Sequence, residues 1–270
     1  MQEIGRGVVS ILAPNPGPWT GQGTNTYIVT AATGSSLIVD PGPDHAAHLD
    51  AVRDVAVARG VPVAIVVTHG HPDHDEGAAR LRDLLGVPVL AWSREGTASA
   101  DRELADEATI GVGERRLTAL HTPGHRFDHL CLLLEDDRLL FAGDLVAGTG
   151  TVVIAPPEGD VADYLASLRR LRDLDLQLIL PGHGPVIDAP RGLLDGYIQH
   201  REDRERQVLA GLAAGPGTVE QLVASIYAAV DPALHPAAAL STTAHLLKLE
   251  RDHRVTRVQA ANGTELWRLT

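Results

Sequence analysis

The most informative stretch of this sequence is Thr68-His69-Gly70-His71-Pro72-Asp73-His74, which follows an apolar run. That run favours a buried strand, so the stretch lies where a strand ends. His69 and His71 are two residues apart, and an extended segment points both rings the same way. Asp73 and His74 lie at the turn into the next helical segment and can address a second point close to the first. Imidazole nitrogen and carboxylate oxygen are ligands that zinc accepts at about 2.0–2.2 Å, so the stretch predicts a metal site.

Three later segments each place one further histidine or aspartate beside glycine at a predicted loop or strand end. They are Thr122-Pro123-Gly124-His125, Phe141-Ala142-Gly143-Asp144 and Leu180-Pro181-Gly182-His183-Gly184. Glycine permits a tight turn and the close approach of other backbone. A lone histidine in a loop is usually solvent-exposed or hydrogen-bonded to a neighbour. Groups of matched chemistry at several strand ends instead favour metal binding.

The first 190 residues alternate short apolar runs with helical patterns, as in an α/β fold. We expect strands at 26–30, 37–39, 63–67, 87–92, 115–120 and 177–180, a hairpin of 130–135 with 138–142, and helices at 44–59, 76–85 and 161–174. Cys131, the only cysteine, lies in the apolar run of that hairpin, so an inert core thiol is expected and no intrachain disulfide can form.

The pattern changes near Ala189. Helices are expected at 191–212, 218–229 and 236–251, followed by strands at 255–260 and 266–269 on either side of Asn262-Gly263, a strong hairpin signal. Three helices followed by a hairpin are typical of a winged-helix module. We therefore predict a catalytic domain of residues 1–190 and a small winged-helix-like domain of residues 191–270.

Charge and hydropathy restrict the partners of this chain. The formal net charge is −12, and residues 1–190 carry all of that excess, with 14 Arg against 26 Asp or Glu. An acidic chain argues against a general nucleic-acid binder, because phosphate neutralisation needs a basic face. The N-terminal segment has no basic stretch followed by a long apolar one, and no apolar run approaches the length of a membrane span. A cytoplasmic location without membrane contact is predicted.

The order of these motifs resembles the metallo-β-lactamase fold superfamily, whose His-x-His-x-Asp-His signature is followed by a single His, Asp and His. The resemblance covers residues 1–190. The segments Asn15-Pro16-Gly17-Pro18 and Gly23-Thr24-Asn25-Thr26-Tyr27, together with the C-terminal module, resemble the β-lactamase-like protein 2 group. Members of that group include a mitochondrial endoribonuclease, and related proteins hydrolyse thioesters of carrier proteins.

The resemblance implies an α/β fold, a four-layer αβ/βα sandwich with its site where two sheets meet, and it implies the ligand assignment. The first metal is assigned to His69, His71 and His125, the second to Asp73, His74 and His183, and Asp144 to a bridging position. Two Zn²⁺ per chain are expected, with iron or manganese as the alternatives. Asp40 is expected to orient the ligand loop by hydrogen bonding, as carboxylates behind metal ligands commonly do.

The expected mechanism is that of two adjacent divalent ions. At a separation of about 3.5–4 Å they share a water and lower its pKa towards 7, so that a metal-bridging hydroxide forms and attacks a carbonyl carbon or phosphorus. Asp73 is the predicted catalytic residue because it can orient that hydroxide. This chemistry needs no side-chain nucleophile.

Several other residues carry open interpretations. His129 could face the cleft as an acid or substrate contact, or could be a satisfied structural histidine. Trp19, in a loop of Pro and Gly, could cover an apolar part of the substrate or belong to an ordinary packed turn. His45 and His48 are three residues apart on a predicted helix, where a solvated face is expected.

The leading functional prediction is a dinuclear zinc hydrolase that cleaves an ester, thioester or related small-molecule bond. One alternative is a metal-dependent endoribonuclease acting on single-stranded RNA, which would need basic or aromatic residues along a groove. Another is a mononuclear iron persulfide dioxygenase, because such enzymes share this fold and signature. A third is a non-catalytic winged-helix regulator. The expected partner is a small-molecule or acyl-thioester substrate, with RNA as the alternative, and a homo-oligomer is compatible with the sequence.

Overall fold

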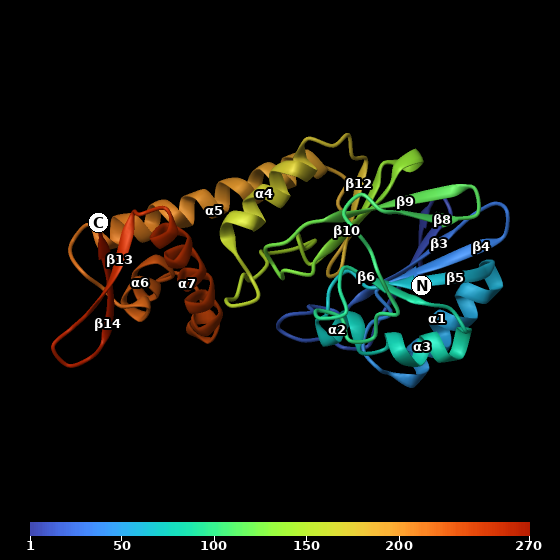
Figure 1. Cartoon of the computed structure of the whole chain (residues 1–270), viewed down its shortest axis with the longest axis horizontal. Helices are drawn as coiled ribbons and strands as arrows, with labels where there is room; N and C mark the ends of the chain where they lie inside the picture. Colours follow the sequence, from blue (N-terminus) through green and yellow to red (C-terminus); the bar gives the residue numbers. More distant parts are fainter.

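The computed structural model describes the whole chain, residues 1–270, and shows two parts joined by one long helix (Figure 1). The larger part contains two β-sheets. The first has seven strands in sequence order: β1 (Gln2–Gly5), β2 (Val8–Leu12), β3 (Asn25–Thr30), β4 (Ser35–Val39), β5 (Val61–Val66), β6 (Val89–Ala91) and β7 (Arg102–Glu103). The second has the order β12-β11-β10-β9-β8, with β8 (Thr109–Val112), β9 (Arg115–His121), β10 (Leu130–Leu134), β11 (Leu139–Gly143) and β12 (Leu178–Pro181).

Alternate residues of the strands enter different hydrophobic clusters, because successive side chains of a strand point to opposite faces. In β3, Tyr27 and Val29 pack between the two sheets, whereas Ile28 packs on the outer face with Leu49 and Leu81. Those two leucines belong to the helices that cover the first sheet, α1 (Ala46–Arg59) and α3 (Ala78–Leu85).

The second sheet is covered in the same way. Cys131 of β10 and Leu140 of β11 pack with Tyr164 and Leu168 of α4 (Val161–Arg172). The larger part is therefore a helix–sheet–sheet–helix sandwich, which confirms the predicted αβ/βα architecture, and Cys131 is fully buried as expected.

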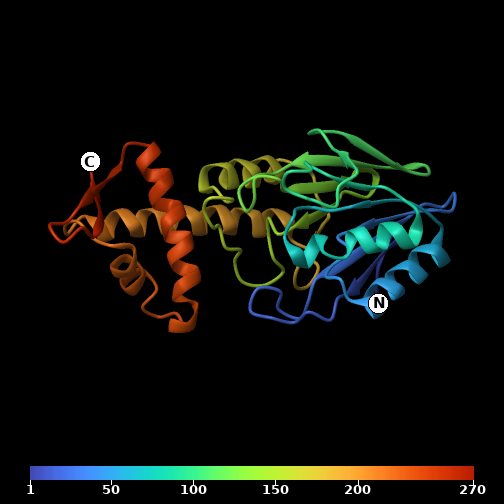
Figure 2. The same ribbon diagram turned by 60° about the horizontal axis from the view of Figure 1, so that its bottom comes forward.

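The smaller part has its own core. It consists of the second half of α5 (Pro190–Leu212), α6 (Val219–Ile226), the short 3₁₀ helix η2 (Pro232–Leu234), α7 (His235–Arg251) and the hairpin of β13 (Val255–Gln259) with β14 (Glu265–Leu269). Val208 and Leu212 of α5 pack there with Trp267, whereas Leu194 and Tyr197 of the same helix pack in the larger part. The helix α5 therefore belongs to both cores, and Figure 2 shows α7 crossing it.

Most of the predicted elements are confirmed, and the differences have local causes. The expected helix at 76–85 begins two residues later, as α3, because Gly77 packs so closely that a Cβ atom would lie 2.9 Å from the carbonyl oxygen of Gly42. A separate short helix, α2 (Pro72–Asp75), precedes it. Strands β1, β2, β7 and β8 were not predicted. The 3₁₀ turn η1 (Glu135–Asp137) closes the predicted hairpin of β10 and β11. No helix has both the length and the apolar character needed to cross a bilayer.

Candidate metal centre

The ligand candidates follow strands at the edge where the two sheets meet, and they lie in loops except for Asp73 and His74, which belong to the short helix α2. Their potential ligand atoms form two groups, and within each group these atoms lie no more than 4.8 Å from one another. One group is His69, His71, His125 and Asp144, and the other is Asp73, His74 and His183. The structure therefore brings together all seven residues that the sequence analysis assigned as metal ligands.

In the first group, three imidazole nitrogens face the same point. Nδ1 of His71 lies 2.9 Å from Nε2 of His69 and 3.1 Å from Nε2 of His125. Ligands bound to zinc at 2.0–2.1 Å in tetrahedral geometry are separated by about 3.3 Å. The three rings are thus close to the spacing that a single metal ion requires.

The second group has similar spacing and the same donor chemistry. Nε2 of His183 lies 3.3 Å from Nε2 of His74 and 3.1 Å from Oδ2 of Asp73. Imidazole and carboxylate donors of this kind suit zinc, iron or manganese. Both groups therefore fit a divalent transition-metal ion.

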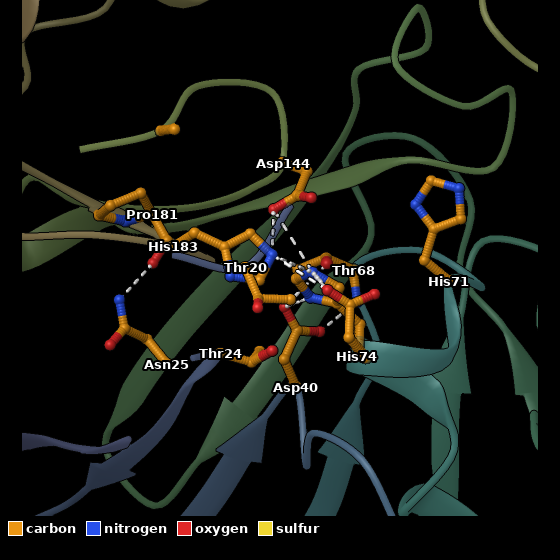
Figure 3. Close-up of polar contacts among 12 residues, drawn as sticks. Thr20, Thr24, Asn25, Asp40, Thr68, His71, His74, Asp144, Pro181 and His183 are labelled. Carbon is orange, nitrogen blue, oxygen red and sulfur yellow. Dashed lines mark hydrogen bonds and ion pairs between the residues drawn. The ribbon is translucent and has the colours of Figure 1, made fainter. Parts of the chain in front are cut away.

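Asp144 belongs to the first group and also faces His74 and His183 of the second (Figure 3). Its Oδ1 atom is 3.4 Å from Nε2 of both His74 and His183, whereas its Oδ2 atom is 3.8 Å from Nε2 of His125. One oxygen of this carboxylate thus faces each group.

Asp40 contacts the ligand candidate His74 and the start of the loop that precedes it. It follows β4, and its Oδ2 atom accepts hydrogen bonds from Nδ1 of His74 at 2.8 Å and from Oγ1 of Thr68 at 2.8 Å. Its Oδ1 atom accepts from the backbone N–H of Thr68 at 2.7 Å. An acceptor at Nδ1 fixes the proton there and leaves the lone pair of His74 Nε2 for a metal.

Two other ligand histidines are oriented by backbone carbonyls. Nδ1 of His125 donates to the carbonyl oxygen of Val153 at 2.9 Å, and Nδ1 of His183 lies 3.3 Å from that of Gly23. In both rings Nε2 is therefore the nitrogen that faces the centre.

Burial and neighbouring charges shift the pKa values of two histidines of the centre in opposite directions. Burial, together with the neighbouring His125 and Arg126, lowers the pKa of His71 to about 4. Burial also lowers the pKa of His183, but Asp144 and Asp73 outweigh it and raise that pKa to about 9. A histidine must be neutral to bind a metal ion, so metal binding at His183 releases a proton.

Asp128 and Arg126 support the first group, although sequence reasoning missed them. Oδ2 of Asp128 accepts from the backbone N–H of Gly70 at 2.9 Å, and Oδ1 accepts from Nε of Arg126 at 2.7 Å. Gly70 itself packs so closely that a Cβ atom would lie 1.8 Å from the carbonyl oxygen of Gly96. Both residues are in the segment that follows His125, but only the fold reveals their contacts.

Asn25 and Tyr27 hold the loop that carries His183. The side-chain amide of Asn25 donates to the carbonyl oxygens of Pro181 and Gly184, at 3.1 and 2.9 Å. The hydroxyl of Tyr27 donates to that of Pro181 at 2.7 Å. These contacts explain what two residues of the Gly-Thr-Asn-Thr-Tyr segment do in the fold. The sequence analysis assigned no role to them.

The remaining candidates lie outside the two groups. His129 is fully buried, with Nδ1 3.0 Å from Oγ1 of Thr122 and Nε2 accepting from the backbone N–H of Asp144 at 3.1 Å, so it cannot contact a substrate. Trp19 is 63% exposed and therefore does not belong to a packed turn. The expectation of a solvated face was wrong for His48, which is buried with Nε2 3.1 Å from Oγ1 of Thr26.

Comparison with known proteins identifies the family. The model of the metallo-beta-lactamase superfamily matches residues 19–183. The chain belongs to this superfamily. The model of the beta-lactamase-associated winged helix domain matches residues 218–267 of this superfamily member, which accounts for the smaller part.

Two curated relatives match 77% and 99% of this superfamily member. A beta-lactamase-like protein 2 homolog from Caenorhabditis elegans is 36% identical over 218 residues, 77% of this chain and 72% of that protein. An atrochrysone carboxyl ACP thioesterase from Aspergillus chevalieri is 33% identical over 284 residues, 99% of this chain and 88% of that protein. The crystal structure of a metallo-beta-lactamase family protein from Thermus thermophilus shares the fold, with a TM-score of 0.82, 22% identity, and coverage of 99% of this chain and 100% of that one. Together with the two ligand groups, these relatives indicate a metal-dependent hydrolase.

Proposed function

We propose that this protein is a dinuclear zinc hydrolase that cleaves an acyl thioester. The observation that carries the proposal is the position of Asp144, which directs one carboxylate oxygen to each group of ligands. A carboxylate so placed can hold two metal ions side by side, which is the arrangement of two-metal hydrolytic sites. Metal ions bound there would lower the pKa of a water molecule and polarise the carbonyl oxygen of the substrate.

Other side chains of the centre orient the attacking water or hold the residues that would bind metal. Asp73 is 26% exposed, so its carboxylate can accept a hydrogen bond from the attacking water and orient it towards the carbonyl carbon. His129 holds the backbone of Asp144, and Asp40 holds the ring of His74. None of these roles requires a covalent acyl-enzyme. Cys131 is not available for one, because burial raises the pKa of its thiol to about 12.

The thioester is proposed as the scissile bond on two grounds. A relative that matches 99% of this chain is named as an ACP thioesterase. The acidic balance of residues 1–190 also disfavours a long nucleic-acid groove, which would need basic side chains. Trp19 is exposed on the loop that follows β2 and is proposed to contact the acyl group.

The test is a hydrolysis screen of the zinc-loaded protein with thioesters, lactones, β-lactams, phosphodiesters and single-stranded RNA. We expect turnover of thioesters, lost by at least a hundredfold in Asp144→Ala, which should also bind less than two zinc ions. Asp136→Ala, which removes an exposed carboxylate from the hairpin turn, is the matched control and should keep both properties.

Three outcomes would contradict the proposal. If Asp144→Ala retains the wild-type rate, the activity does not come from this centre. If protein purified without added metal contains one iron per chain and no zinc, the persulfide dioxygenase alternative is favoured instead. Cleavage of RNA but of no thioester would replace the proposed substrate by the endoribonuclease alternative.

A further inference from the structure

Helices α5 and α7 meet in a buried polar cluster that the metal centre does not explain. It consists of Arg201 and Arg204 of α5, whose charges act on the buried His245 of α7, and of Thr242, which precedes His245 by three residues on the same helix; we call it the α5–α7 cluster. Five of its side-chain atoms are buried without a hydrogen-bond partner: Nε of both arginines, Oγ1 of Thr242 and both ring nitrogens of His245. The only other buried side-chain atoms without a hydrogen bond are Oγ1 of Thr30 and Nε of Arg172, and the latter lies 2.6 Å from Oδ1 of Asp195. Buried polar groups normally have partners, so such a concentration points to a missing ligand.

The charge of Arg201 supports the same conclusion. Three arginines of the chain are less than one-tenth exposed, and two of them, Arg115 and Arg126, form ion pairs with Asp137 and Asp128. Arg201 is 3% exposed and has no carboxylate partner. Its guanidinium group donates to the carbonyl oxygen of Val152 and lies 5.1 Å from the ring centre of Tyr164. An uncompensated buried charge is unfavourable for folding, so stability alone does not account for this residue.

The surroundings of Arg201 are basic as well. The guanidinium group of Arg204 lies 4.2 Å from the ring centre of Tyr227 and donates to Oε1 of Gln207, again without a carboxylate. Burial, together with the positive charges of Arg201 and Lys248, lowers the pKa of His245 to about 3. The cluster therefore combines strong donors with positive charge and lacks an anionic acceptor.

The cluster adjoins both the surface and the metal centre. Arg204 and the neighbouring His200 are half-buried, so one edge of the cluster reaches solvent. On its other side Arg201 holds Val152, and the carbonyl oxygen of the next residue, Val153, accepts from Nδ1 of His125. One loop therefore contacts the cluster and a metal-ligand histidine at adjacent residues.

We propose that the α5–α7 cluster binds a phosphate group of the substrate. The guanidinium groups would supply two positive charges in the fork geometry that suits phosphate oxygens, while the Thr242 hydroxyl and one ring N–H of His245 would donate further hydrogen bonds. This inference rests on the proposed function, because a thioester on the phosphorylated pantetheine arm of a carrier protein carries such a phosphate. The smaller part of the molecule then has a task in the reaction, which is to hold the distal end of the substrate.

The first experiment measures phosphate binding without turnover. Zinc-loaded protein is titrated with inorganic phosphate at constant ionic strength, and binding is followed by the rise in Tm. We expect Arg201→Met to weaken the phosphate affinity by about tenfold, as the loss of a charge-assisted hydrogen bond implies. Thr242→Val, which keeps the side-chain volume, should weaken it by a smaller factor. Arg191→Met removes an exposed arginine from the same helix and should bind phosphate like the wild type.

Because Arg201 also holds the loop next to His125, Arg201→Met can alter phosphate binding at the metal ions as well. Thr242→Val leaves that hydrogen bond in place, so its difference from the wild type reports on the cluster. Methionine in place of an unpaired buried charge is not expected to lower the Tm measured without phosphate. If Arg201→Met does not fold, Thr242→Val still provides the comparison.

The second experiment compares acetyl-pantetheine with acetyl-4′-phosphopantetheine as substrates. We expect the wild type to have the lower KM for the phosphorylated thioester, and the ratio of the two KM values to fall towards one in Arg201→Met but not in Arg191→Met. Equal phosphate affinities and equal KM ratios in wild type and Arg201→Met would overturn the inference. If neither thioester is hydrolysed while Arg201→Met still loses phosphate affinity, the anion site stands and the proposed function is wrong.

Discussion

At the scale of single residues, Asp40 shows how a side chain outside the ligand groups can control a ligand. Its carboxylate accepts from His74 and from two donors of Thr68, so it connects one metal ligand to the start of the loop that carries three others. Its backbone has a φ of 51°, in the left-handed region that few residues other than glycine adopt. Backbone strain of this kind persists where the surrounding structure imposes it, often at functional sites.

Replacement of Asp40 tests this control. Asparagine tolerates the left-handed region, so Asp40→Asn should keep the backbone, but the neutral amide is a poorer acceptor for Nδ1–H of His74. We expect zinc affinity at the group of Asp73, His74 and His183 to fall by about 10- to 100-fold, as for other carboxylates that orient metal-bound histidines. Competition with a chromophoric chelator measures this change.

The matched control is Asp44→Asn, which removes an exposed carboxylate four residues later and should leave both zinc affinities unchanged. Equal affinity in Asp40→Asn and wild type would show that His74 keeps its orientation without the carboxylate.

At the scale of elements, Glu114 connects two turns of opposite sheets. It lies between β8 and β9, and its carboxylate accepts from the backbone N–H groups of Ala32 and Thr33 and from the Thr33 hydroxyl, between β3 and β4. The hydrogen bond from the Thr33 hydroxyl, followed by those from backbone N–H groups, lowers the pKa of Glu114 to about 2.

This lowered pKa makes a prediction about pH. A carboxyl whose pKa is lower in the folded state stabilises the fold above its unfolded pKa and loses that contribution as pH falls towards the folded value. Glu114→Gln should therefore lower the Tm at pH 7, and the difference from wild type should shrink between about pH 4.5 and pH 2. Thermal unfolding followed by circular dichroism across this range measures the difference.

Glu95→Gln, at an exposed glutamate, is the control and should show no such convergence. A difference in Tm that stays constant down to pH 2 would mean that the charge of Glu114 is not what joins the two turns.

Local patterns explain why many elements could be predicted and others could not. Strands that are buried on both faces, such as β10 and the second half of β5, appear as apolar runs, and α4 repeats its apolar residues at helical spacing. Strand β7 has two residues and β8 has four, which is too short for any period to be visible. The division of α2 from α3 depends on contact between Gly77 and the loop at Gly42, which is a tertiary effect.

The same distinction applies to the candidate site. The ligands were visible in the sequence because their residue types and short spacings carry the chemistry by themselves. Asp128, Asn25 and Tyr27 were not, because each acts through a backbone group that is distant in sequence, up to 159 residues away for Asn25. The exposed face expected for His45 and His48 was half wrong because the turn after β4 folds over His48 and its carbonyl oxygen at Pro41 lies 3.1 Å from that ring.

At the scale of the whole molecule, metal removal should affect the two parts differently. The ligand candidates follow strands of both sheets, so metal ions bound there would join the two halves of the sandwich, whereas the smaller part has a separate core around Trp267. A ligand that binds only the folded state stabilises it by about 2.7 kcal/mol at a hundred times its Kd, and two metal ions act together in this way.

Chelation should therefore lower the Tm of the larger part. Hydrogen exchange should accelerate in the loop 68–75 and around His125 and His183, while β13 and β14 keep their protection. Readdition of zinc should reverse both changes. Uniform acceleration across the two parts would instead mean that the long helix α5, which belongs to both cores, makes them unfold as one unit.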